Sequence, residues 1–193
     1  GSEHLFSHLW EMEGLGVDLV PRRLSHGFKV AVGSVAITAL FEALLDDGLA
    51  SLAVDAAVAA WPSPDALQRI VLAHHTAPGL REAAVQQTMA KYVDAATVGH
   101  RLESLAAAWP TLSERLREHL IPAGDLQRML RAAGAPAHPS DINLGWDDFR
   151  ATYVRAQLIR SRYTILDTLA EAALLEPLVD RLFAPEGFWG RQA

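Results

Sequence analysis

The stretch Phe28–Ala50, FKVAVGSVAITALFEALLDDGLA, decides the fold class. Its large apolar residues follow one another closely with few polar residues between them: Val30, Val32, Val35, Ile37, Leu40, Phe41, Leu44 and Leu45. Its β-branched start resembles a strand, but the run is too long for a strand and no turn residue interrupts it. Gly48 stands where a glycine commonly follows a helix. We therefore predict a long buried helix.

The chain on the C-terminal side of this stretch also has helical patterns. Ser63 and Pro64 are typical of an N-cap and a first helical residue. Residues 80–121 are expected to form one or two long helices, with Trp109 and Pro110 marking the break.

Two further segments complete the prediction. Residues 122–136 are expected to form a short helix that ends at Gly134 and Pro136. Residues 138–175 are expected to run from a loop into one long amphipathic helix, whose apolar stripe is Trp146, Phe149, Tyr153, Ala156, Ile159 and Tyr163. No strands alternate with these helices and no glycine-rich phosphate loop occurs. We predict that residues 1–193 form a single all-α domain, a helical bundle.

Composition restricts the classes of function. The net charge is −6, so the chain lacks the basic surface that binds phosphates of a nucleic acid, and we expect no nucleic-acid partner. There is no cysteine, so a metal ion would have to be bound by histidine and carboxylate side chains. We identify no apolar run long enough to span a bilayer and no signal peptide, which predicts a cytoplasmic protein without a membrane span.

Three histidines near the N-terminus are candidate ligands. His4 and His8 are four residues apart, so on a helix both rings lie on one face. His26 follows 22 residues after His4, about the number needed for a helix and a loop that brings the chain back. Gly27 beside it would let the backbone turn close to an ion. Imidazole is a common metal ligand, but a polar helix end and a histidine in a turn would give the same spacing. The pattern permits a shared metal site without requiring one.

The remaining histidines show no such arrangement. His74 and His75 are adjacent and point apart on a helix, and we interpret both, together with His100, His119 and His138, as structural or solvated residues. In RSRYTILD, residues 160–167, Arg160 and Arg162 accompany an apolar helix; a salt-bridged surface is the favoured interpretation and a buried polar role the alternative.

Three motifs in this order carry a resemblance to a known family. GSEHLFSH (1–8), LSHGFKVAVGS (24–34) and RSRYTILD (160–167) look like the C-terminal half of the sn-glycerol-1-phosphate dehydrogenases, within the iron-containing alcohol dehydrogenase and dehydroquinate synthase superfamily. The motifs extend over nearly the whole chain. In that family an α/β nucleotide-binding domain precedes a helical, metal-binding domain, and the all-α prediction agrees with the second.

The resemblance implies specific roles. His4 and His26 match the metal-binding histidines, for zinc, nickel or iron, and His8 matches the catalytic histidine that faces the substrate. The third protein ligand of the family, an aspartate, belongs to the preceding domain, as do most groups that bind NAD or NADP. That domain or subunit would be a partner, and a homo-oligomer is expected. Phe28 stands where many relatives have a glutamate, which leaves the exact substrate open.

The implied reaction is hydride transfer between a nicotinamide and a small phosphorylated substrate, interconverting dihydroxyacetone phosphate and sn-glycerol 1-phosphate. Two alternatives remain open. A sugar-phosphate cyclase of the dehydroquinate synthase type would use the same histidines. A helical binding or scaffold domain would retain them without catalysis.

Overall fold

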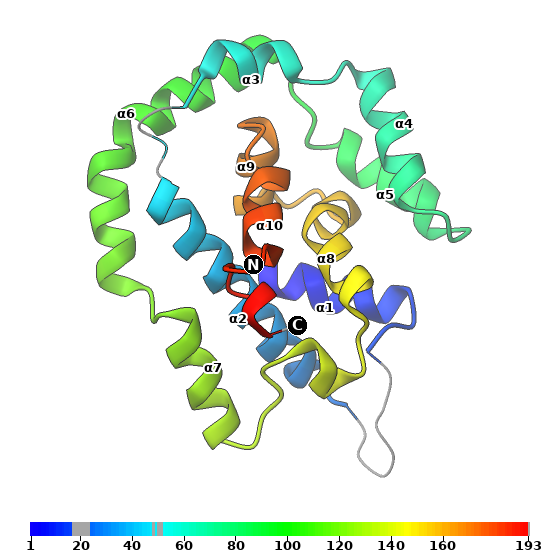
Figure 1. The fold of residues 1–193 in the computed structure, drawn as a ribbon. Coiled ribbons are helices and arrows are strands. Elements are labelled where there is room, and N and C mark those ends of the chain that lie inside the picture. Colours follow the sequence, from blue (N-terminus) through cyan, green and yellow to red (C-terminus); the bar gives the residue numbers. More distant parts are fainter. Residues whose placement is uncertain (17–23, 48, 50–51, 193) are drawn as a thin grey trace.

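The computed structural model describes residues 1–16, 24–47, 49 and 52–192 (Figure 1). All regular structure in these residues is helical, which confirms the all-α prediction. The α-helices are α1 (Ser2–Met12), α2 (His26–Asp47), α3 (Val54–Ala60), α4 (Pro64–His74), α5 (Leu80–Met89), α6 (Ala95–His119), α7 (Ala123–Ala132), α8 (Trp146–Arg155), α9 (Ile165–Glu171) and α10 (Leu175–Phe183). The 3-10 turns are η1 (Pro139–Ile142), η2 (Ala156–Ile159) and η3 (Gly190–Gln192).

Helix α2 is the central element of the larger core. It packs against α1, α7 and α10, and its predicted apolar residues are buried except for Val30 and Phe41, which are half-buried. By length and composition alone residues 26–46 could cross a membrane, so our expectation that no apolar run reaches this length was wrong. Just over half of the tested window, 56%, is buried inside the fold, and core helices of soluble proteins pass the same test. Its packing accounts for its composition.

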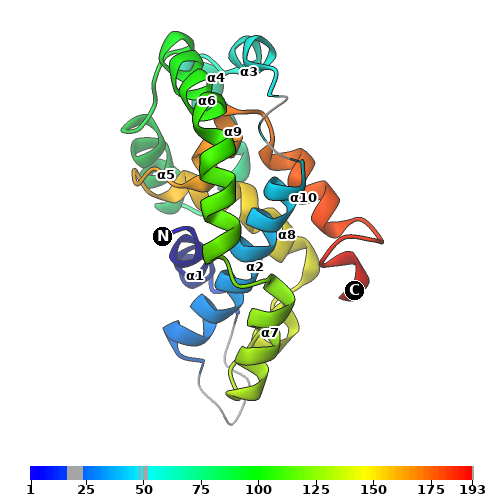
Figure 2. The same ribbon diagram turned by 90° about the vertical axis from the view of Figure 1, so that its left-hand side faces the viewer.

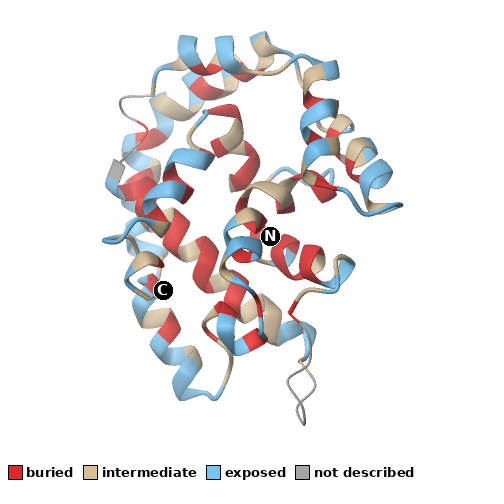
Figure 3. Cartoon of the chain, turned by 45° about the vertical axis from the view of Figure 1, so that its right-hand side comes forward, coloured by how far each residue is buried: buried red, intermediate tan, exposed pale blue. Residues whose placement is uncertain are grey.

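Helices outside this core lie along one side of the molecule and at one end of it. Helices α6 and α7 follow one another along one side of the molecule (Figures 1 and 2). Helices α3, α4 and α5 lie at one end, where α3 packs on α6 and α4 on α5. Two small apolar clusters lie here, one completed by Ala172 after α9 and the other by Leu158 of η2. Figure 3 shows buried residues concentrated on the inner helices and on the inward faces of the outer ones.

Aromatic side chains join α1, α2 and α8 inside the core. Trp10 Nε1 donates to Thr152 Oγ1 at 2.8 Å, Trp189 Nε1 donates to the Tyr153 hydroxyl at 2.8 Å, and that hydroxyl donates to the carbonyl of Ala36 at 3.1 Å. All three rings are fully buried. Satisfying their polar atoms avoids the cost of an unpaired buried donor and fixes α1 against α8.

One predicted helix boundary differs from the structure and another is confirmed. Helix α6 continues through Pro110, where a break was predicted. A proline removes one backbone hydrogen bond, but Trp109 is buried beside it, and packing on both sides of Pro110 retains the helix. The Ser63 start of α4 is confirmed, since its side chain accepts from the amide of Ala66 at 3.3 Å.

The long helix predicted within 138–175 is interrupted. Helix α8 ends in η2, and Arg160–Tyr163 are not helical before α9 begins at Ile165. The predicted apolar stripe is buried from Phe149 to Ile159, but Tyr163 is 42% exposed. Side chains of α5 bond to the backbone on both sides of Arg160, an interaction that helical periodicity cannot predict.

Candidate metal and substrate site at the histidine cluster

Helix α1 has two different faces. Leu5, Phe6, Leu9 and Trp10 are buried in the core, as the i, i+4 spacing of an amphipathic helix requires. The opposite face carries His4, which is exposed, and His8, which is half-buried. The burial of one face therefore presents both histidines on the same open side.

A close contact between helices brings His26 to this face. A Cβ atom on Gly33 of α2 would lie 2.7 Å from the carbonyl oxygen of Glu3 on α1, a separation that only a glycine permits. His26 is the first residue of α2, and Ser25 accepts from the amide of Phe28 at 3.2 Å as a helix cap does. Gly27 lies in the first helical turn and not at a tight turn, so the reason we gave for it was wrong.

The structure brings the three predicted site residues together. The ring centroid of His26 lies 5.7 Å from that of His4 and 5.3 Å from that of His8. Two imidazoles that share a tetrahedral ion through bonds of about 2 Å have centroids roughly 5 Å apart. These separations therefore suit rings that face one small ligand.

Two glutamates that we did not predict hydrogen-bond to the candidate metal ligands. His4 Nδ1 lies 3.0 Å from Glu3 Oε1, and His26 Nδ1 lies 2.9 Å from Glu11 Oε1. Each bond uses Nδ1 and leaves Nε2 available. A carboxylate on the second ring nitrogen orients a metal-binding histidine and increases its basicity. The nearness of Glu3 to His4 in sequence was a usable indication, whereas Glu11 meets His26 only through the packing of α1 on α2.

The charges around the cluster shift several pKa values. Partial burial and the positive charge of Arg160 lower the pKa of His8, so its ring favours the neutral form. The hydrogen bond from His26 lowers the pKa of Glu11. Burial raises the pKa of Glu3, whereas the hydrogen bond from His4 lowers it. The cluster thus pairs ionised carboxylates with imidazoles.

The donor set fits an incomplete metal site. Among the described residues no group of three or more His, Asp or Glu side chains is arranged to hold a metal ion. His4 and His26 supply two nitrogen donors with free Nε2 atoms, one fewer than the three protein ligands of a catalytic zinc site. Phe28 lies in the first turn of α2, two residues from His26, and adds no polar donor.

The other histidines occupy different surroundings. His75 is fully buried beside Glu13 and Arg155, which agrees with its interpretation as a structural residue. His74 and His138 are half-buried, and burial lowers the pKa of each. His100 and His119 are exposed on α6. None of the five has a described ring contact with the cluster of His4, His8 and His26.

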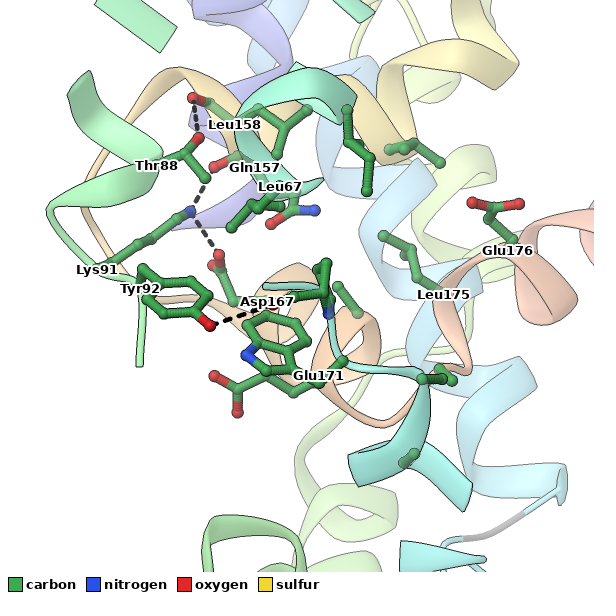
Figure 4. Close-up of a pocket in the computed structure, with 18 of the residues that line it drawn as sticks. Leu67, Thr88, Lys91, Tyr92, Gln157, Leu158, Asp167, Glu171, Leu175 and Glu176 are labelled. Carbon is green, nitrogen blue, oxygen red and sulfur yellow. Dashed lines mark hydrogen bonds and ion pairs between the residues drawn. The ribbon is translucent and has the colours of Figure 1, made fainter. Parts of the chain in front are cut away.

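A cavity of about 380 Å³ lies away from the cluster, between α3, α4, α5, η2, α9 and α10 (Figure 4). Several of its polar side chains are paired with one another or with nearby residues. Lys91 forms an ion pair with Asp167, Glu171 Oε1 accepts from Arg101 at 2.7 Å, and Glu171 Oε2 accepts from the Tyr163 hydroxyl at 2.6 Å. These bonds tie Lys91, Arg101 of α6 and Tyr163 to α9.

Comparisons of the chain with protein-family models, with curated proteins and with solved structures find no match in any of the three.

Proposed function

We propose that this chain is the metal- and substrate-binding part of an NAD(P)-dependent dehydrogenase acting on a small polyol phosphate. Three motifs support the proposal by their resemblance to the sn-glycerol-1-phosphate dehydrogenases. One structural observation carries it: His4 and His26 each hydrogen-bond to a glutamate through Nδ1, and their rings lie 5.7 Å apart with Nε2 available. Metal-binding histidines commonly donate their second ring N–H to a carboxylate in this way, which supports the proposal.

The proposal assigns a separate role to each residue of the cluster. His4 and His26 would hold the ion, which when bound polarises a ketone oxygen and stabilises the negative charge that develops there. Glu3 and Glu11 hold the two rings in orientation. The nicotinamide, bound by a separate domain or subunit, would supply the hydride.

We assign the proton transfer to His8. Its ring lies 5.3 Å from that of His26, so it would reach an oxygen held beside His26. Its lowered pKa keeps it neutral near pH 7, so its protonated form is a strong acid toward an alkoxide and its neutral form accepts a proton from an alcohol. His8 would donate a proton during reduction and accept it in the reverse direction.

Zinc titration of the 193-residue chain tests the proposal. We expect weak binding, and we expect His4→Ala and His26→Ala each to reduce the affinity by about tenfold or more, since each removes one of two nitrogen donors. His100→Ala, which removes an exposed histidine on α6, is the control and should leave the affinity unchanged. Equal zinc affinity in all four proteins would contradict the proposal, as would reduction of dihydroxyacetone phosphate by the chain alone.

A further inference from the structure

The cavity between α3, α4, α5, η2, α9 and α10 has no role in the function proposed above. None of the described residues that line it belongs to α1 or α2, the helices that carry the histidine cluster. The helices around it pack elsewhere, α3 on α6, α4 on α5, α5 on η2 and α9 on α10. Its volume of about 380 Å³ lies within the range of roughly 300 to 1,000 Å³ that small-molecule sites occupy, so it is large enough for a ligand.

The wall of this cavity is mainly apolar. Leu67 of α4, Leu158 of η2 and Leu175 of α10 line it and are buried. Ile70 of α4 and Ala60, the last residue of α3, also line it but are exposed, which marks the edge that is open to solvent. An apolar ligand would therefore displace water from apolar side chains, which is favourable.

Several hydroxyl and charged groups on the wall are bonded within the protein. Thr88 Oγ1 donates to a backbone carbonyl at 2.9 Å, and the Tyr92 hydroxyl donates to another at 3.1 Å. Lys91 forms an ion pair with Asp167 on the same side of the cavity (Figure 4). A ligand that displaces water here leaves none of these four groups without a partner, so covering them costs little.

The charges on the wall largely cancel. Lys91 and Asp167 neutralise each other, and Glu171 accepts from Arg101 at 2.7 Å. Glu176 also lines the cavity, but it is exposed and lies on the side opposite Lys91 (Figure 4). A charged ligand would lose its hydration without meeting an unpaired opposite charge in the interior, which favours an uncharged ligand.

One polar side chain on the wall keeps its hydrogen-bonding capacity. The side-chain amide of Gln157 forms no hydrogen bond with any residue that the structure describes, whereas the backbone carbonyl of the same residue accepts from Lys91. An amide group offers both donors and an acceptor. Gln157 can therefore bond to a single hydroxyl or carbonyl oxygen of a ligand, and the bond from Lys91 holds its backbone in place.

We propose that this cavity binds a small uncharged organic molecule with a compact apolar body and one hydroxyl or carbonyl group. The apolar body contacts the leucine side chains of α4, η2 and α10, and the oxygen atom bonds to the amide of Gln157. The site is independent of the function proposed for the histidines, because none of the described residues on its wall belongs to their cluster.

Calorimetric titration of the 193-residue chain with three probes tests the ligand class. 2-Naphthol is uncharged at neutral pH, 2-naphthoate is an anion and 2-naphthylmethylammonium is a cation, while all three have the same ring system. We expect 2-naphthol to bind about tenfold or more tightly than either charged probe, because only the charged probes lose the hydration of an ion. Equal or tighter binding of a charged probe would show that the assigned class is wrong.

Ala60→Phe tests the location of the site. A phenyl ring at residue 60 would occupy part of the cavity, and we expect it to weaken 2-naphthol binding by about tenfold or more. Ala59→Phe is the matched control, because Ala59 is an exposed neighbour on α3 that does not line the cavity. Its affinity should equal that of the unaltered chain, and equal thermal midpoints without the probe establish that both variants are folded.

Gln157→Leu tests the hydrogen bond, because it keeps a side chain of similar size and removes the amide. We expect about a fivefold loss of 2-naphthol affinity, as the loss of one hydrogen bond gives, and an unchanged affinity would contradict this contact. His4→Ala should bind 2-naphthol as the unaltered chain does, which separates the cavity from the histidine cluster. The inference is overturned if 2-naphthol shows no saturable binding, or if Ala60→Phe and Ala59→Phe bind it equally.

Discussion

Glu11 and Glu13 lie two residues apart at the end of α1, and each faces a histidine, yet the two pairs have opposite properties. The side chains of Glu11 and His26 are 39% and 43% exposed, whereas those of Glu13 and His75 are 11% and 0% exposed. A hydrogen bond from His26 lowers the pKa of Glu11. Burial raises the pKa of Glu13, in part against the attraction of Arg155. Similar groups therefore differ through solvation.

The difference separates an exposed pair from a buried pair that holds the fold. Arg155 pairs with Glu13, its Nε donates to the carbonyl of His74 at 2.9 Å, and its own carbonyl accepts from His75 Nε2 at 3.2 Å. These bonds connect the end of α1 to α4 and α8, with little exposure to water. The pair of Glu11 and His26 can exchange its partners with solvent or a ligand at low cost.

The largest expected effect comes from breaking the buried cluster. Arg155→Met leaves Glu13 and the carbonyl of His74 without their partner, and we expect it to lower the free energy of unfolding by about 4 kcal/mol. Urea denaturation measures the change. The control is Arg150→Met on the same helix, where the ion pair with Asp180 is exposed and contributes less than about 1 kcal/mol. Similar losses in both variants would show that the buried cluster has no special role.

A smaller effect is expected from the charge of His75. Burial, together with the charge of Arg155, lowers its pKa to about 4, whereas the unfolded chain has the ordinary value near 6.5. The unfolded state therefore binds the proton first, and stability falls as the pH decreases from 6.5 to 4. We expect a loss of roughly 2 to 3 kcal/mol over this range, measured by denaturation at successive pH values.

Replacement of His75 isolates this contribution. His75→Asn should make the loss of stability below pH 6.5 shallower, because the variant has no imidazole to protonate on unfolding. His100→Asn, on the exposed face of α6, should keep the original pH dependence. If the two variants have the same slope, burial of His75 does not control the acid stability.

The smallest effect on stability is expected at the exposed pair. Glu11→Gln should change the free energy of unfolding by less than about 0.5 kcal/mol, because an exposed ion pair contributes little. It should nevertheless weaken zinc binding by about tenfold, because it removes the carboxylate that orients His26. Glu103→Gln, which alters the exposed pair with His100, should change neither quantity. A stability loss in Glu11→Gln as large as that in Arg155→Met would remove the contrast between the two sites.

Sequence patterns within a single helix predicted the features that depend only on residues close together in the chain. The apolar run of α2 predicted its burial, and the spacing of four predicted that His4 and His8 share a face of α1. His26 lies beside them, an arrangement that the spacing permitted without requiring it. The assignment of metal and substrate roles, and the resemblance to a dehydrogenase domain, remain predictions.

Packing between distant segments determined what the patterns did not predict. Glu13 meets His75 and Arg155 only because α1, α4 and α8 converge, and these residues are far apart in sequence. Pro110 remains within α6 because of a buried neighbour, and the break at Arg160 depends on side chains of α5. Periodicity contains no information on such contacts.

The contact at Gly33 sets how the cluster tolerates sequence change. The backbone of Glu3 occupies the space where a side chain at position 33 would lie, so main-chain contact sets how closely α1 approaches α2 at this point. A methyl group at position 33 would push α1 and α2 apart, so the separation of the histidines on these two helices depends on a residue that has no side chain.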